Sequence, residues 1–187
     1  MSANLRRFTR AVYAMDAVAN RVDPSNWQAD SPCDDWCAQE VLGHALTVVD
    51  MVASLAVGEE AQWQEPLDAV GDDPIAAWAA ARDRVLEHLD RPDVLHAIRP
   101  SPFGEMPVDD FLGAIWVDTL THAWDLATAT RQPHGISADL AIDAEASLAA
   151  LGDGIRGKGR FGPIVEGDFD DPIDSWIAMA GRVPSGR

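Results

Sequence analysis

The segment 107–130 (PVDDFLGAIWVDTLTHAWDLATAT) constrains the fold most. It is long enough for an extended helix, and it contains a single glycine and no proline after its first residue. Four of its residues recur at spacings of one helical turn and share one face of the predicted helix: Phe111, Ile115, Asp118 and His122. The first two are ordinary core residues. The last two place a carboxylate and an imidazole on the face that should point into the core.

Asp118 and His122 form a pair with two interpretations. An unpaired carboxylate is costly to bury, so Asp118 needs a partner. His122 lies one turn further along the same face, with Cβ atoms about 5–6 Å apart. Two side chains at this spacing can bind one metal ion, as the two histidines of the H-E-x-x-H motif do. A buried Asp–His hydrogen bond without a metal would also satisfy both groups.

A second histidine lies on the apolar stripe of another predicted helix, 38–57, where His44 shares a face with Val41, Val48, Val52 and Leu55. A lone histidine on such a stripe is often a core residue bonded to a carbonyl group. Together with Asp118 and His122, however, it makes three ligands from two helices. Three ligands leave at least one coordination position open, as in catalytic metal sites. His96, in the loop before the central helix, is an alternative ligand.

Composition limits the class of protein. The chain has 187 residues with 47% hydrophobic and 24% charged residues, which predicts one globular domain over 1–187. Its formal charge of −17, from 14 Lys+Arg against 31 Asp+Glu, argues against nucleic acid and anionic membrane surfaces as partners. No apolar run approaches the roughly 20 residues of a membrane span. The N-terminus lacks the apolar block of a signal peptide, and we expect a cytoplasmic protein whose cysteines, Cys33 and Cys37, are structural thiols.

The order of predicted helices indicates an all-α protein built on a four-helix bundle. The helices of bundle length are predicted over 3–20, 38–57, 74–90 and 108–130. Additional short C-terminal helices follow, one after the capping residue Ser137 and one from Asp171-Pro172 to Gly181. The proline-rich segment 91–107 is predicted to be a crossover loop, with a short extended piece at 94–98.

The glycine-rich segment 152–167 holds the one basic cluster of this acidic chain, Arg156, Lys158 and Arg160. It lacks the spacing of a phosphate-binding P-loop. One interpretation is a solvated connector. The other is a mobile flap whose three cations bind an anionic substrate or a thiol cofactor.

Several motifs together resemble an actinobacterial group related to the N-terminal domain of mycothiol-dependent maleylpyruvate isomerase, within the DinB-like superfamily of four-helix bundles. They are SPCDDW at 31–36 followed by a helix with His44, FGEMP at 103–107, THAWDLA at 121–127 and GRVP at 181–184. The resemblance implies a divalent metal, typically zinc, held by one histidine of the second helix and an acid-x-x-x-His pair of the fourth. These positions match His44, Asp118 and His122, with Asp118 standing where the isomerase commonly has a glutamate.

The resulting expectation is a metal-dependent enzyme that uses a low-molecular-weight, mycothiol-like thiol for transfer to, or isomerisation of, a small electrophile. Its partners would be a small-molecule substrate or the thiol, with a homodimer as a further possibility. Asp125, three residues after His122, would either orient a ligand imidazole or pair locally. Two alternatives stay open from the sequence: a metal- or ligand-binding protein without turnover, and a purely structural, dimeric helical bundle.

Overall fold

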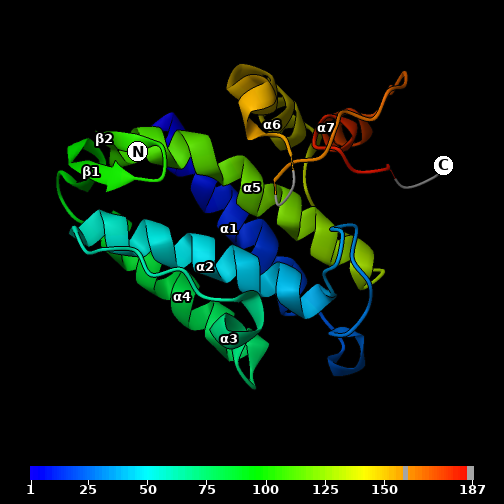
Figure 1. The fold of residues 1–187 in the computed structure, drawn as a ribbon, viewed down its shortest axis with the longest axis horizontal. Coiled ribbons are helices and arrows are strands. Elements are labelled where there is room, and N and C mark those ends of the chain that lie inside the picture. The colour runs from blue at the N-terminus through cyan, green and yellow to red at the C-terminus, as the bar shows by residue number, and fades with distance from the viewer. Residues whose placement is uncertain (158–159, 185–187) are drawn as a thin grey trace. The chain divides into compact units, whose positions relative to one another are not determined.

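The computed structural model describes residues 1–157 and 160–184, which belong to two compact units, 1–134 and 135–187. The first unit contains the four long helices that were predicted (Figure 1). Their bounds are α1 Ala3–Ala19, α2 Ala38–Val57, α4 Pro74–Leu89 and α5 Val108–Ala129. Each bound lies within one residue of the expectation, and the predicted all-α class is confirmed.

The four long helices close into a bundle. α1 packs against α5 and α4, and α2 packs against α4 and α5. Large aromatic side chains fill the space between them, and those of Phe8, Trp78, Phe111 and Trp116 are at most 1% exposed. α5 is buried on nearly every side along its second half, so its polar residues there lie inside the bundle. Because buried polar groups normally make hydrogen bonds, we expect each of these residues to contact a polar partner or a ligand.

Local capping chemistry fixes where these helices begin and end. The Ser2 hydroxyl accepts a hydrogen bond from the Leu5 amide at 3.0 Å and starts α1. The Asp73 carboxylate accepts one from the Ala76 amide at 3.0 Å, and Pro74 occupies the first turn of α4. Gly58 ends α2 in the left-handed conformation, with φ of 80°. These signals are visible in the sequence, which is why the predicted bounds agree.

The connections contain structure that the sequence pattern did not predict. Short helices form at Pro24–Asn26 (η1), Pro66–Val70 (α3) and Val94–His96 (η2), so the extended piece expected at 94–98 is wrong for its first three residues. The strands β1 Ile98–Ser101 and β2 Gly104–Pro107 then form an antiparallel hairpin that leads into α5. A two-stranded hairpin consists only of edge strands, which tolerate proline. The prolines therefore stopped a helix here without preventing strand pairing.

Gly43 allows the backbone at Pro66 to pack directly against α2. A Cβ at this position would lie 2.0 Å from the carbonyl oxygen of Pro66, which is closer than two such atoms can approach. The absence of a side chain therefore allows the start of α3 to pack directly on α2. His44 is the next residue of α2, so the 59–65 segment that leads into α3 passes near its side chain.

Helix α2, with 20 residues and a mean hydropathy of 1.5 over its most apolar window, is long and apolar enough to cross a membrane by length and composition alone. Its apolar window is interrupted by charged residues, and 67% of it is buried inside the fold. Buried core helices of other proteins pass the same length and composition test.

The second unit contains α6 Ala138–Leu151, a short helix at Gly152–Ile155 (η3), and α7 Pro172–Met179. Both predicted C-terminal helices are therefore present. Ser137 precedes α6 as expected, and the Asp171 carboxylate accepts a hydrogen bond from the Ile173 amide at 2.7 Å to start α7.

Candidate metal centre

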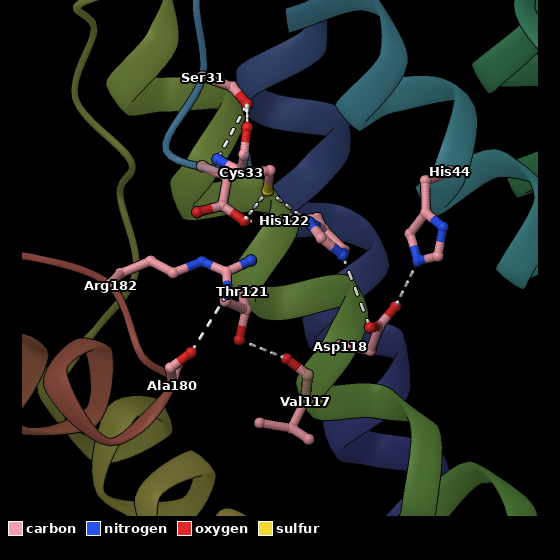
Figure 2. Close-up of polar contacts among 10 residues, drawn as sticks. Ser31, Cys33, His44, Val117, Asp118, Thr121, His122, Ala180 and Arg182 are labelled. Carbon is pink, nitrogen blue, oxygen red and sulfur yellow. Dashed lines mark hydrogen bonds and ion pairs between the residues drawn. The ribbon is translucent and has the colours of Figure 1, made fainter. Parts of the chain in front are cut away.

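The structure brings His44, Asp118 and His122 together at one end of the first unit. α2 and α5 pack against each other, so that His44 in the first half of α2 lies beside Asp118 and His122 near the middle of α5. The blue connection between α1 and α2 lies at this same end, close to where α5 ends (Figure 1). One Asp118 oxygen is 3.4 Å from Nε2 of His44, and the other is 3.5 Å from Nε2 of His122. One ligand atom from each residue lies within 4.8 Å of the other two, and Figure 2 shows both imidazoles turned toward the carboxylate.

The spacing of these atoms is longer than that of ordinary hydrogen bonds and is compatible both with ion pairs and with a shared metal ion. Both distances exceed the 2.7–3.2 Å range of ordinary N–H···O bonds. Ligand bonds of 2.0–2.2 Å in a tetrahedral zinc site put two ligand atoms about 3.3–3.5 Å apart. In addition, Asp118 Oδ2 is buried and makes no hydrogen bond with any described residue. The three residues therefore have the donor chemistry and the spacing of a divalent-metal site.

The charges of the site depend on each other. Burial acts to raise the pKa of the Asp118 carboxyl, but the imidazoles of His122 and His44 outweigh burial and hold this pKa well below its usual range. Burial acts to lower the pKa of His122. The negative charge of Asp118, together with the hydrogen bonds that His122 makes with Asp118, Asp125 and Cys33, outweighs burial and raises this pKa well above its usual range. In the metal-free protein the carboxylate and the imidazolium thus stabilise each other. A cation would compete with the proton on His122.

Asp125 fixes the orientation of His122 from the opposite side of the ring. It is fully buried, and its Oδ2 lies 3.0 Å from Nδ1 of His122. A carboxylate can only accept, so Nδ1 carries the proton and Nε2 is free to face Asp118. This contact fits both roles expected for Asp125, since it would orient the ring of His122 as a metal ligand and is also a local pair. Trp124, beside it in sequence, is 3% exposed and packs in the core.

Cys33 joins this group, and the sequence pattern did not identify it. Its Sγ lies 3.1 Å from Asp125 Oδ2 and 3.8 Å from Nδ1 of His122. The sequence predicts a structural thiol here, because free cysteines are often simply buried. The only available signal was the SPCDDW motif, whose cysteine and tryptophan are three residues apart in a loop. Cys37, by contrast, ends this loop as the N-cap residue of α2.

Two indole rings surround the imidazoles. The ring centroid of Trp36 is 5.0 Å from that of His44 and 5.9 Å from that of His122. Trp63 meets His44 edge-on at 5.6 Å and is itself 59% exposed. His44 Nδ1 makes no hydrogen bond with any described residue, so these aromatic contacts hold its ring. The site thus has an apolar wall at Trp36 and a partly exposed one at Trp63.

The other residues singled out from the sequence lie elsewhere. His96 is exposed and belongs to neither of the ligand groups found among the described residues. In the second unit, Arg156 donates hydrogen bonds to the carbonyl oxygens of Gly162 and Met179, at 2.7 and 3.0 Å. The exposed Arg160 donates to the carbonyl oxygen of Gly154 at 2.9 Å. Both arginines therefore support the local backbone, while Lys158 lies outside the described residues. Anion binding by this cluster stays a prediction.

Comparison with known proteins gives the family. Residues 8–127, more than half of the chain, match the family model described as the mycothiol maleylpyruvate isomerase N-terminal domain. The chain is 31% identical over 152 residues, 81% of each chain, to the uncharacterized protein Rv0738 of Mycobacterium tuberculosis strain H37Rv. The same values hold for the uncharacterized protein MT0763 of strain CDC 1551. No solved structure matches the chain significantly. The matched range contains all the residues of the candidate metal centre, and the chain belongs to the mycothiol maleylpyruvate isomerase N-terminal domain family.

Proposed function

We propose that the protein binds a divalent metal, preferably zinc, through His44, Asp118 and His122, and uses it to activate a low-molecular-weight thiol. The observation that carries this proposal is the group of three ligand atoms within 4.8 Å, with imidazole–carboxylate distances of 3.4 and 3.5 Å. Two imidazoles and one carboxylate are ligands that zinc accepts in catalytic sites. The family, whose name refers to a mycothiol-dependent isomerase, supports a thiol as the second component.

A divalent ion bound at this site would act as a Lewis acid that lowers the pKa of a thiol and so makes a nucleophile available at neutral pH. Residues of the protein would orient the metal ligands and border the site. Asp125 keeps the proton of His122 on Nδ1, which leaves Nε2 available for the ion. Trp36 covers both imidazoles and excludes water from that side. The exposed Trp63 borders the side from which a small electrophile and the thiol would enter.

The experiment that tests this function uses the visible spectrum of protein loaded with cobalt(II), which reports on the ligands of the ion. Addition of mycothiol is expected to shift this spectrum, with cysteine and glutathione as comparisons, because sulfur would become an additional ligand. Chromatography of the same thiol with candidate electrophiles would then detect a transfer or isomerisation product.

The matched control is Asp110→Asn, an exposed carboxylate on the same helix, which should leave the cobalt spectrum and its response to thiol unchanged. A spectrum that none of the thiols changes would exclude thiol activation at this ion. A thiol response without any product would assign a binding or sensory role in place of catalysis.

A further inference from the structure

His122 presents donor groups on both edges of its ring. Nε2 faces Asp118 and His44, as described above. On the opposite edge, Nδ1 lies 3.0 Å from Asp125 Oδ2 and 3.8 Å from Cys33 Sγ, and the sulfur and the carboxylate oxygen are 3.1 Å apart. Figure 2 shows the sulfur beside one ring nitrogen of His122, while the other ring nitrogen faces Asp118. These three atoms also lie within 4.8 Å of one another, so a second set of three metal-ligand atoms adjoins the first.

We propose that Cys33, Asp125 and Nδ1 of His122 form a second cation site for a thiophilic ion such as Cd²⁺, which would be occupied in place of the hydrogen bond from Nδ1 of His122 to Asp125. The donor set is one sulfur, one oxygen and one nitrogen. Thiolate sulfur selects soft cations, whereas the His44, Asp118 and His122 set contains no sulfur and suits borderline ions. Only the second set contains sulfur, which favours soft ions there more than at the first set, and this site goes beyond the proposed function.

The spacing of the three donor atoms permits a shared ion. Bonds of about 2.3 Å to sulfur and about 2.0–2.2 Å to nitrogen and oxygen in a tetrahedral site place the sulfur about 3.5 Å from each of the other two ligands. The measured separations from sulfur are 3.1 and 3.8 Å, on either side of that value. The separations of Asp125 Oδ2 from Nδ1 of His122, 3.0 Å, and from Cys33 Sγ, 3.1 Å, are hydrogen-bond distances in the metal-free protein, and both must widen when an ion replaces the two protons.

Charge favours a divalent ion here. Coordination by Cys33 requires the thiolate, and Asp125 is already an acceptor-only carboxylate. The ion replaces two protons, one from the sulfur and one from Nδ1, and both pass to solvent. Two anionic ligands then neutralise a divalent cation. This compensation matters because Asp125 is fully buried, and an uncompensated charge at that depth would be costly.

The loop that carries Cys33 is held in place before any ion binds. The Ser31 hydroxyl accepts the Cys33 amide proton at 3.1 Å, and the Ser31 amide donates to the Trp36 carbonyl oxygen at 3.1 Å. The Trp36 amide in turn donates to the Cys33 carbonyl oxygen at 3.2 Å. Asp35 adopts a left-handed conformation with φ of 65° to close this turn. The sulfur is therefore positioned by a hydrogen-bonded loop, which lowers the cost of ordering a ligand.

The test is titration of the metal-free full-length protein with Cd²⁺, followed by the ultraviolet absorption of thiolate-to-cadmium charge transfer. The wild-type protein is expected to develop this absorption, and the Cys33→Ser variant to lose it. Serine keeps a hydroxyl group that can donate to Asp125, so the hydrogen-bond network remains while the sulfur ligand is removed. Cys37→Ser is the matched control and should retain the absorption, since Cys37 belongs to neither ligand group found among the described residues.

A further variant separates this site from the proposed function. Asp118→Asn impairs the His44, Asp118 and His122 set but leaves all three donors of the second set, so it should retain the charge-transfer absorption. Wild-type protein that binds Cd²⁺ without this absorption would overturn the proposal, and the cluster would then be only a hydrogen-bond network. Loss of the absorption in Asp118→Asn or in Cys37→Ser, with the fold intact by circular dichroism, would overturn it as well.

Discussion

Protein purified without added metal is expected to contain about one equivalent of a divalent ion, and the His122→Ala variant to contain none. Of the two candidate imidazole ligands, His122 is the one whose second ring nitrogen, Nδ1, contacts a buried carboxylate, that of Asp125. Its removal also leaves Asp118 facing a single imidazole. Loss of residues that only orient a ligand typically costs 10–100-fold in metal affinity, so loss of the ligand itself should cost more. Elemental analysis, with competition against a chromogenic chelator, measures both quantities.

The same measurement on two Asp118 variants separates the role of the negative charge from that of the side-chain length. Asp118→Asn keeps the shape but removes the anionic ligand, and should lose the ion. Asp118→Glu adds one methylene group and keeps the charge, and should retain binding, since the resembling isomerases commonly carry glutamate there. Thermal melting with and without zinc provides the fold control, because a bound ion raises the melting temperature by mass action. If wild-type protein contains no metal and takes none up, the trio is a buried polar cluster.

Helical periodicity predicted the part of the site that lies on one element. Asp118 and His122 are four residues apart, and the stripe they share with Phe111 and Ile115 was visible in the sequence. His44 required a further step, because it belongs to another helix and only its position on an apolar stripe indicated that it points inward. The structure places all three ligand atoms together. Metal binding by them remains a proposal.

Cys33 could not be predicted in the same way. It lies in a loop, where no period relates a side chain to a direction. Its contact with Asp125 spans 92 residues of sequence. The β1–β2 hairpin was missed for a related reason, since its two strands are only four residues long and each contains a proline. In both cases the conformation is set by backbone hydrogen bonds and turn geometry, and the sequence signals for these are weaker than the signal for a helix.

Replacement of Asp125 by alanine is expected to have the largest effect on stability of any single change at the site. Asp125 is fully buried and accepts from Nδ1 of His122 at 3.0 Å and from Cys33 Sγ at 3.1 Å. Its removal leaves both donors without this acceptor and His122 without one of the carboxylates that stabilise its charge. Breaking a buried ionic pair in this way typically costs about 3–5 kcal/mol. Urea unfolding of metal-free protein measures the loss directly.

The Asp125→Asn variant distinguishes the two roles of this carboxylate. An amide oxygen can still accept the proton of Nδ1, so the free energy of unfolding should fall by less than in Asp125→Ala. Metal affinity should nevertheless fall by about 10–100-fold, because a neutral amide no longer raises the basicity of the ligand imidazole. Asp110→Ala is the control for stability, and as an exposed change in the first turn of α5 it should cost no more than about 1 kcal/mol. Equal metal affinity in wild type and Asp125→Asn would mean that Asp125 contributes only to the stability of the fold and not to metal binding. Nε2 of His122 would then be positioned by the packing of Trp36 and His44 against its ring.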